Sequence, residues 1–288
     1  MANTRVTTPV TDLDKATSLP GLKLPSGTNA NQPSGVQGMI RNDTGENTGG
    51  SASAIEHHNG TNWQYFAATE SPDVVYPTSL KMYLDASNTA SYPETGTTWF
   101  DLTSNGNDGA LVNMTPSNWN PAGYFQFDGS NDVVTLGSDM GFITRTWQAW
   151  VNPYVIQRQY ILNTYGSTIT IGAAWVEMNA NGTIRAGVRN SSNVSSFSDS
   201  STTLSTNSWN DICMTTDGTN LKLYINGILD FTVAANLTSI ASNSQNLVIG
   251  KNIRVNSYYW NGRMSKVRIY DTALTQPEIT ALEIEGPL

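Results

Sequence analysis

Leu221-Lys-Leu-Tyr-Ile-Asn-Gly-Ile-Leu-Asp-Phe231 decides the fold of this chain. Asn226-Gly is a two-residue turn signal, and the runs on both sides have the composition of strands, which predicts a β-hairpin. The preceding run, Trp209-Asn-Asp-Ile-Cys-Met, also looks like a strand and is followed by the turn signal Asp217-Gly-Thr-Asn. Neighbouring strands joined by tight turns indicate an antiparallel sheet.

The same pattern continues outward in both directions. Many short strands separated by turn signals, with a single helix, are typical of an all-β sandwich or jelly roll of two sheets. The helix is predicted at Gln276–Ile284, opening after Thr275 with Pro277 in its first turn. Further strands are expected at Leu80–Leu84, Gly123–Phe127, Val133–Leu136, Thr146–Val151, Tyr160–Asn163, Thr168–Gly172, Trp175–Asn179, Ile184–Arg189, Leu247–Gly250 and Tyr258–Tyr270.

Composition narrows the classes of function. The chain has 288 residues, of which only 13% are charged, and its net charge of -8 argues against nucleic acid as a partner. Arg263, Lys266 and Arg268 are the longest basic cluster, and we expect them on a solvated or inter-subunit strand face. Cys213 is the one cysteine, so no disulfide framework exists, and we expect it to be a small buried hydrophobe.

The N-terminal sequence lacks the apolar run of a signal peptide, and no stretch approaches the length of a membrane helix. The sequence therefore predicts synthesis in a cytoplasm and no membrane insertion.

The chain changes character near residue 75. Residues 1–50 are rich in turn formers and poor in large apolar side chains, so they predict an extended arm that is either flexible or ordered by docking. Residues 51–75 predict a small β-hairpin around Asn59-Gly60, followed by a proline-bounded linker. Residues 76–288 form the predicted sandwich. His57 and His58 are neighbours in the hairpin and would point to opposite faces of a strand.

The sandwich region resembles the LamG-like (laminin G-type, concanavalin A-like) jelly roll. Six blocks carry the likeness in the family's order: Tyr83-Leu-Asp-Ala-Ser with Trp99-Phe-Asp-Leu-Thr, Phe125-Gln-Phe-Asp-Gly, Trp147-Gln-Ala-Trp-Val, Trp209-Asn-Asp-Ile-Cys, Leu221-Lys-Leu-Tyr-Ile-Asn-Gly and Trp260-Asn-Gly-Arg-Met. The resemblance implies the fold, and it implies that Trp99, Trp147, Trp150 and Trp209 are packing residues. Because lectins, adhesion domains and lyases share this fold, it does not fix the function.

Residues 18–66 resemble a module of tailed-phage fibres and other virion proteins. Leu24-Pro-Ser-Gly-Thr, Gly38-Met-Ile-Arg-Asn and Asn59-Gly-Thr-Asn-Trp carry this likeness, although His57-His58 stands where the module has an aromatic residue. The resemblance implies a bacteriophage virion protein that forms a homotrimer and contacts other virion proteins of the tail, baseplate or capsid. Localisation in the virion follows, with release from the host cytoplasm by lysis.

Two loops are candidates for a Ca²⁺ site of the kind that LamG-like domains hold at a loop rim. Carboxylate and amide oxygens gather in both loops. The alternative is that these side chains cap turns through their own hydrogen bonds. The candidates are Asp101, Asn105, Asn107 and Asp108 in one loop and Asp128 and Asp132 in the other.

A glycan site is predicted from aromatic residues in or beside loops, since sugars bind to aromatic faces next to amide or hydroxyl groups. The best cluster is Asn256-Ser-Tyr-Tyr-Trp-Asn, in which Tyr258 is the foremost surface candidate and Trp260 is expected in the core. The full set of candidates is Tyr258, Tyr259, Trp175, Trp119 and Asn256.

Catalysis finds little support. The chain has no Gly-x-Ser-x-Gly, His-Glu-x-x-His or phosphate loop, and both histidines precede the sandwich. A carboxylate pair for glycoside hydrolysis, with Glu177 unplaced, stays an alternative. The sequence thus predicts a non-enzymatic tail-fibre or receptor-binding protein that binds a host cell-surface glycan. The competing hypotheses are a capsid decoration or head-fibre protein and, less favoured, a polysaccharide lyase or glycosidase.

Overall fold

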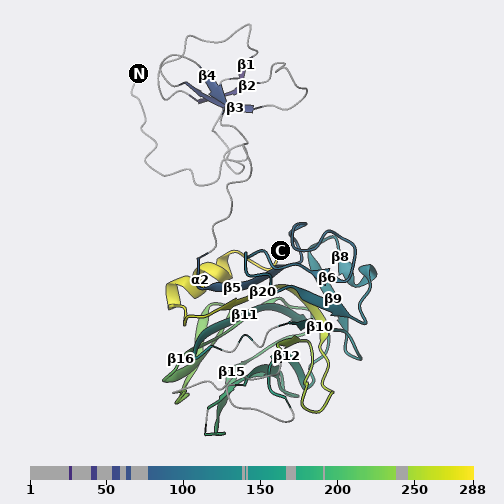
Figure 1. Cartoon of the computed structure of the whole chain (residues 1–288), viewed down its shortest axis with the longest axis vertical. Coiled ribbons are helices and arrows are strands. Elements are labelled where there is room, and N and C mark those ends of the chain that lie inside the picture. Colours follow the sequence, from purple (N-terminus) through teal and green to yellow (C-terminus); the bar gives the residue numbers. More distant parts are fainter. Residues whose placement is uncertain are drawn as a thin grey trace. The chain divides into compact units, whose positions relative to one another are not determined.

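A computed structural model describes residues 77–137, 140, 142–166, 173–190, 192–237 and 246–288, together with four short strands nearer the N-terminus. The chain divides into two compact units, Met1–Val75 and Tyr76–Leu288 (Figure 1). The strand predicted at Thr168–Gly172 lies outside the described residues.

The described strands of the first unit form one sheet in the order β1-β2-β3-β4. β1 and β2 are parallel, whereas β2 with β3 and β3 with β4 are antiparallel. The pairing of β2 with β3 joins residues on the two sides of position 50. The bounds are β1 Ser26–Gly27, β2 Ile40–Asp43, β3 Ala54–His58 and β4 Trp63–Tyr65.

The second unit is an all-β sandwich of two sheets, as the sequence predicts (Figure 1). The front sheet has the order β15-β14-β13-β12-β19-β10-β7-β6. Its strands are β6 Thr98–Trp99, β7 Gly109–Val112, β10 Val133–Leu136, β12 Gln159–Asn163, β13 Ala174–Met178, β14 Thr183–Arg189, β15 Ser195–Thr203 and β19 Val248–Ile249.

The back sheet has the order β18-β17-β16-β11-β20-β9-β8, and β5 pairs with β20 beside β9. A short 3₁₀ helix, η2 (Pro116–Asn118), precedes β8. The strands are β5 Leu80–Asp85, β8 Trp119–Asn120, β9 Tyr124–Asp128, β11 Thr144–Pro153, β16 Asn210–Asp217, β17 Asn220–Ile225, β18 Ile228–Ala234 and β20 Asn261–Tyr270.

The core lies between the two sheets, because alternate residues of each strand point to the same side. Trp99, Trp147 and Trp260 are completely buried there. Burial of one such large apolar side chain contributes roughly 1.5–3 kcal/mol to folding. Trp150 is also buried, whereas Trp209 is half-buried with its ring 5.9 Å from that of Tyr124.

The outer face of the back sheet is covered by helix α2 (Gln276–Ile284), which has the predicted bounds (Figure 1). Ile279 of the helix packs with Cys213 and Tyr224, so the cysteine is the buried hydrophobe that the sequence predicts. Glu278 accepts a 2.7 Å hydrogen bond from the backbone N–H of Thr275, which closes the first turn of the helix. Among the described residues, no helix has the length and apolar character needed to cross a membrane.

The basic cluster of β20 differs from expectation. Lys266 and Arg268 are buried, at 6% and 3% exposure, because the C-terminal segment folds over them. Lys266 donates to the Gly286 carbonyl at 2.9 Å, and Arg268 pairs with Glu285 while donating to the Tyr83 hydroxyl at 2.7 Å. The solvated alternative was wrong for these two residues, because the alternation of β20 does not reveal what covers it, whereas Arg263 is partly exposed.

Asp211 is a buried carboxyl on β16 that accepts a 2.7 Å hydrogen bond from Gln148 Nε2. Burial raises its pKa from 3.8 to about 7, and the Gln148 bond and the charge of Arg268 offset this only in part. Its second oxygen, Oδ2, has no hydrogen-bond partner. A neutral, protonated acid suits this environment better than a carboxylate.

Stability should therefore fall as pH rises from about 4 to about 7. In that interval the folded state holds a proton on Asp211 that the unfolded chain has released, so raising the pH favours unfolding. At about 1.4 kcal/mol per pKa unit, the full loss between these two pH values is about 4 kcal/mol. Asp211→Asn should flatten this part of the profile, measured by chemical denaturation at pH 5 and pH 8. An unchanged slope in the variant would place the pH dependence elsewhere.

Candidate functional site

The outer face of the front sheet carries a set of side chains that the core does not use. On β13, Ala174, Val176 and Met178 point into the core, so Trp175 and Glu177 between them point outward. The neighbouring strands β12, β14 and β15 continue this arrangement in register. We call this surface the front face.

One row of the front face is aromatic. Strand pairing aligns Asn163 of β12, Trp175 of β13, Gly187 of β14 and Phe197 of β15. A Cβ atom at Gly187 would lie 2.1 Å from Cζ2 of Trp175, so the indole lies over the glycine and only glycine leaves it room. Trp175 is 6% exposed, whereas Phe197, 6.3 Å away between ring centroids, is 49% exposed.

The next row is charged. Pairing aligns Tyr160, Glu177, Arg185 and Asp199 across the same four strands. Glu177 is 1% exposed and forms a salt bridge with Arg158 at 2.8 Å and a longer one with Arg185 at 3.8 Å. Arg185 also holds Asp199 through both carboxylate oxygens, at 2.6 and 2.9 Å. The charges thus alternate along the row and balance.

These contacts favour the charged forms of Asp199 and Arg158. The hydrogen bond from Arg185 holds the pKa of Asp199 below its ordinary value, and the bond to Glu177 raises the pKa of Arg158. Burial raises the pKa of Tyr160 to about 12, so its hydroxyl stays neutral. A general acid for sugar chemistry needs a raised carboxyl pKa, which Asp199 lacks.

The loop between β19 and β20 brings two predicted glycan residues to this face. The guanidinium of Arg158 lies over the ring of Tyr258, 4.8 Å from its centroid, and the Tyr258 carbonyl accepts a bond from the N–H of Tyr160. Asn256 and Tyr258 have φ values of 48° and 55°. This left-handed backbone explains why the strand predicted from Tyr258 begins only at Asn261.

The third loop candidate, Tyr259, lies beside Asn256. Tyr259 is partly buried and donates to the Asn256 side chain at 3.3 Å, and Lys251 donates to the same oxygen at 2.9 Å. Arg254 of this loop donates to the hydroxyl of Tyr165, whose ring lies 5.2 Å from Trp175. The loop therefore continues the front face beyond the edge of β12.

Trp119 is separate from this group. It lies on β8 of the back sheet, partly buried against Tyr92, and its indole N–H donates to the Ala86 carbonyl at 2.9 Å. The structure thus places Tyr258 and Trp175 on the front face, with Tyr259 and Asn256 in the loop beside it, but not Trp119.

The first candidate metal loop consists of hydrogen-bonded turns. Both oxygens of Asp101 accept bonds from the chain, among them the backbone N–H of Tyr83 at 2.9 Å and of Asn107 at 2.9 Å. Asp108 accepts from the Asp101 N–H at 2.8 Å, and the Asn105 amide donates to the Leu80 carbonyl at 3.2 Å. These contacts are those of the turn-capping alternative.

The second loop has the same character. Asp128 accepts from the backbone N–H groups of Ser130 and Asn131, and Asp132 accepts from the N–H of Asp128 and the amide of Asn118. Within the described part of the sandwich, no three His, Cys, Asp or Glu side chains gather as metal ligands would. These carboxylates are engaged by the turns of their own loops, and we assign no function to a cation here.

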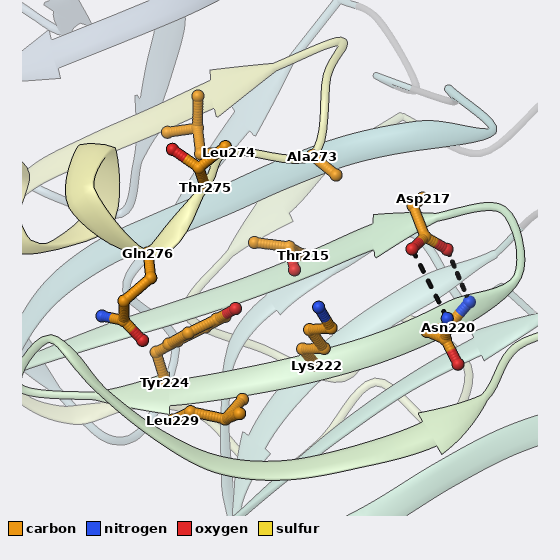
Figure 2. A pocket seen from close by; sticks show the side chains of 10 residues that line it. All are labelled: Thr215, Asp217, Asn220, Lys222, Tyr224, Leu229, Ala273, Leu274, Thr275 and Gln276. Atoms are coloured by element: carbon orange, nitrogen blue, oxygen red, sulfur yellow. Dashed lines mark hydrogen bonds between the residues drawn. The ribbon is translucent and has the colours of Figure 1, made fainter.

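A pocket of about 440 Å³ lies on the opposite side, over the back sheet beside the start of α2. Figure 2 shows Thr215, Lys222 and Tyr224 on two adjacent strands of its wall, with residues 273–276 along the other side. At one end of the pocket, the carboxylate of Asp217 accepts hydrogen bonds from the backbone N–H and the side-chain amide of Asn220. The pocket is lined by one cationic side chain, Lys222, and by scattered apolar atoms, and this lining indicates no reaction. The front face is therefore the stronger candidate for a functional site.

Together the fold and this face define a lectin-like sandwich. The sequence profile of the "Concanavalin A-like lectin/glucanases superfamily" matches residues 123–280, more than half of the chain, and the chain belongs to this superfamily. No curated protein sequence is significantly similar to it.

Solved structures share the fold at low sequence identity. The receptor binding domain of botulinum neurotoxin D has a TM-score of 0.53 at 15% identity, over 72% of this chain and 52% of that one. This chain therefore spans about half the length of that domain. A SAP-like pentraxin from Limulus polyphemus has a TM-score of 0.45 at 16% identity, over 56% and 81% of the two chains. The CBM40 of a Ruminococcus gnavus sialidase, bound to sialyllactose, has 0.43 at 15%, over 50% and 84%.

Sequence reasoning missed Phe197, Tyr165 and the arginines of the front face. Phe197 lies on β15, a nine-residue strand so rich in serine and threonine that it resembles a loop. The arginines lie on one strand, β14, and in two loops, and only folding brings these three segments together. The alternation of Trp175 and Glu177 with small apolar residues was the one available signal.

Gly187→Ala tests the fit of the aromatic row. The added methyl group would overlap the Trp175 ring, so the variant should lose roughly 1–3 kcal/mol of unfolding free energy. Denaturant unfolding followed by tryptophan fluorescence would measure this loss. Gly137→Ala is the control, because a Cβ there meets nothing within 4 Å. Equal effects from both variants would contradict the packing described.

Proposed function

We propose that this chain is a glycan-binding attachment protein of a phage virion, and that the front face of its sandwich holds a sugar chain of the host surface. The observation that carries this proposal is the joint placement of exposed aromatic rings and arginine side chains on one sheet face. Phe197 and Tyr258 are 49% and 38% exposed, and Arg158 and Arg185 lie against these rings.

The chemistry of the face suits a sugar. Exposed aromatic rings can stack on the C–H faces of pyranose rings, while guanidinium and amide groups donate to hydroxyl oxygens. Arg185 lies 5.1 Å from the centroid of Phe197, so stacking and hydrogen bonding are available at one place. Because Glu177 and Asp199 hold the arginines, these donors are oriented before a ligand arrives, which lowers the entropic cost of binding.

Binding without turnover is favoured by the state of the carboxylates. Glu177 is buried between two arginines and Asp199 is held ionised by one, so neither is placed to donate a proton to a glycosidic oxygen. The buried Asp211 has a raised pKa, but it is 0% exposed on the back sheet. The superfamily includes glucanases, and an assay for release of reducing sugar would detect such an activity.

The virion assignment rests on residues 18–66 and their resemblance to phage fibre modules. In this proposal residues 1–75 trimerise the protein and dock it to other virion proteins. Three weak glycan sites on one particle would then bind with high avidity. A capsid decoration or head-fibre protein remains the second candidate, because the same arm could dock on a capsid.

Phe197→Ala should weaken glycan binding roughly tenfold, since an exposed aromatic contact at the centre of a site contributes that much. Tyr258→Ala should act in the same direction. Binding to host cells and to a printed glycan array would measure the loss, and melting temperature would report the fold. Phe100→Ala is the matched control, because Phe100 is 40% exposed just after β6, at the opposite edge of the front sheet from β15. Equal binding by the Phe100 and Phe197 variants would refute the proposed site.

The oligomeric state gives an independent test of the N-terminal unit. Light scattering should show a trimer for the full chain and a monomer for residues 76–288, which form a compact unit. A truncated protein that stays trimeric would remove the trimerisation role from residues 1–75. A monomeric full chain would instead favour a decoration protein that docks singly.

A further inference from the structure

The charges of the front face do not balance at one end. In and beside the charged row, each cation has a carboxylate partner: Arg158 pairs with Glu177, and Arg185 pairs with Asp199. Arg189 and Arg254, by contrast, form no salt bridge with any described residue. Among the described residues, these two positive charges on the face thus have no carboxylate partner, in a protein whose net charge is -8.

These two arginines converge on one neutral atom. Arg189 donates to the hydroxyl oxygen of Tyr165 at 2.6 Å, and Arg254 donates to the same oxygen at 2.8 Å. Both guanidinium groups also lie over the Tyr165 ring, 5.5 and 5.1 Å from its centroid. One phenol oxygen thus orients two cations that come from separate elements, the end of β14 and the loop before β20.

Such an arrangement is costly without an anion. Two guanidinium groups held beside one oxygen repel each other, and a phenol oxygen does not neutralise either charge. The Arg189 guanidinium also donates to the Asn193 amide oxygen at 2.6 Å, and this oxygen is neutral too. The remaining N–H groups of both arginines are donors suited to an oxyanion, which they bind through charge-assisted hydrogen bonds.

The position of the pair connects it to the aromatic row. Tyr165 lies with its ring 5.2 Å from Trp175, and Trp175 in turn lies 6.3 Å from Phe197. A sugar stacked at the exposed Phe197 could therefore extend along this row toward the two arginines. The anion site and the stacking site would then bind different parts of one oligosaccharide.

We infer that the front face selects acidic glycans, and that Arg189 and Arg254, aligned by Tyr165, bind an oxyanion substituent of the sugar. This inference rests on the proposed function and adds the class of ligand to it. The substituent is a carboxylate or a sulfate ester, since both present oxygens that two guanidinium groups can hold.

The test uses the full chain and three immobilised forms of one oligosaccharide. The first contains glucuronic acid, the second is the same chain with its carboxyl groups reduced to alcohols, and the third is the reduced chain bearing sulfate esters. Biolayer interferometry should show at least roughly tenfold tighter binding to an acidic form than to the neutral form. The acidic form that binds more tightly identifies the substituent.

Arg189→Gln, Arg254→Gln and the double variant should lose this preference while keeping their binding to the neutral form. Arg263→Gln is the matched control. Arg263 lies on β20 of the back sheet and, like the two arginines of the front face, donates to a tyrosine hydroxyl, that of Tyr154, at 2.9 Å. Its variant removes the same charge and should keep the preference. Since Arg254 lies in a loop, its single variant stays informative if the Arg189 variant folds poorly.

The outcomes separate the two proposals. Equal binding of neutral and acidic forms, or a preference that survives in the double variant, overturns the acidic-glycan inference. If the Phe197→Ala variant still loses binding in that case, the glycan-binding function stands. Failure of all three forms to bind the unmodified chain would count against both.

Discussion

The structure depends on the burial of apolar side chains between two sheets. Trp99, Trp147 and Trp260 are fully buried, and strands of both sheets contribute every second residue to the same layer. Because a strand alternates strictly, each side chain committed to the core fixes its neighbours on the outside. The front face therefore follows from the core: with Ala174, Val176 and Met178 inward, Trp175 and Glu177 must point outward.

The outer faces of the two sheets differ in what covers them. The C-terminal helix α2 and the residues after it cover part of the back sheet, and they bury Lys266 and Arg268. Among the described residues no helix covers the front sheet, so its outer residues pair with one another instead, as rings over glycine and as arginines against carboxylates. Burying polar groups requires partners for each of them, whereas a face for binding keeps donors available.

The front face combines side chains held in fixed positions with arginines that keep hydrogen-bond donors available. Glu177 and Asp199 hold Arg158 and Arg185 in fixed positions, so this part of the surface is oriented in the absence of a ligand. Tyr165 orients Arg189 and Arg254 without neutralising them. A surface with both features can bind a ligand at low entropic cost and can still gain hydrogen bonds when the ligand arrives.

The sequence by itself determined the sandwich, the helix Gln276–Ile284 and the buried state of Cys213 and Trp260, because alternation, turn residues and caps are local signals. It also indicated that Tyr258 is exposed, since an aromatic residue in a polar loop is visible without a fold. Only the tertiary structure decided that Trp175 lies over Gly187 and beside Phe197, and that arginines from β14 and the loop before β20 meet at Tyr165. These contacts depend on strand order and register, which bring together residues far apart in the chain and which no local pattern specifies.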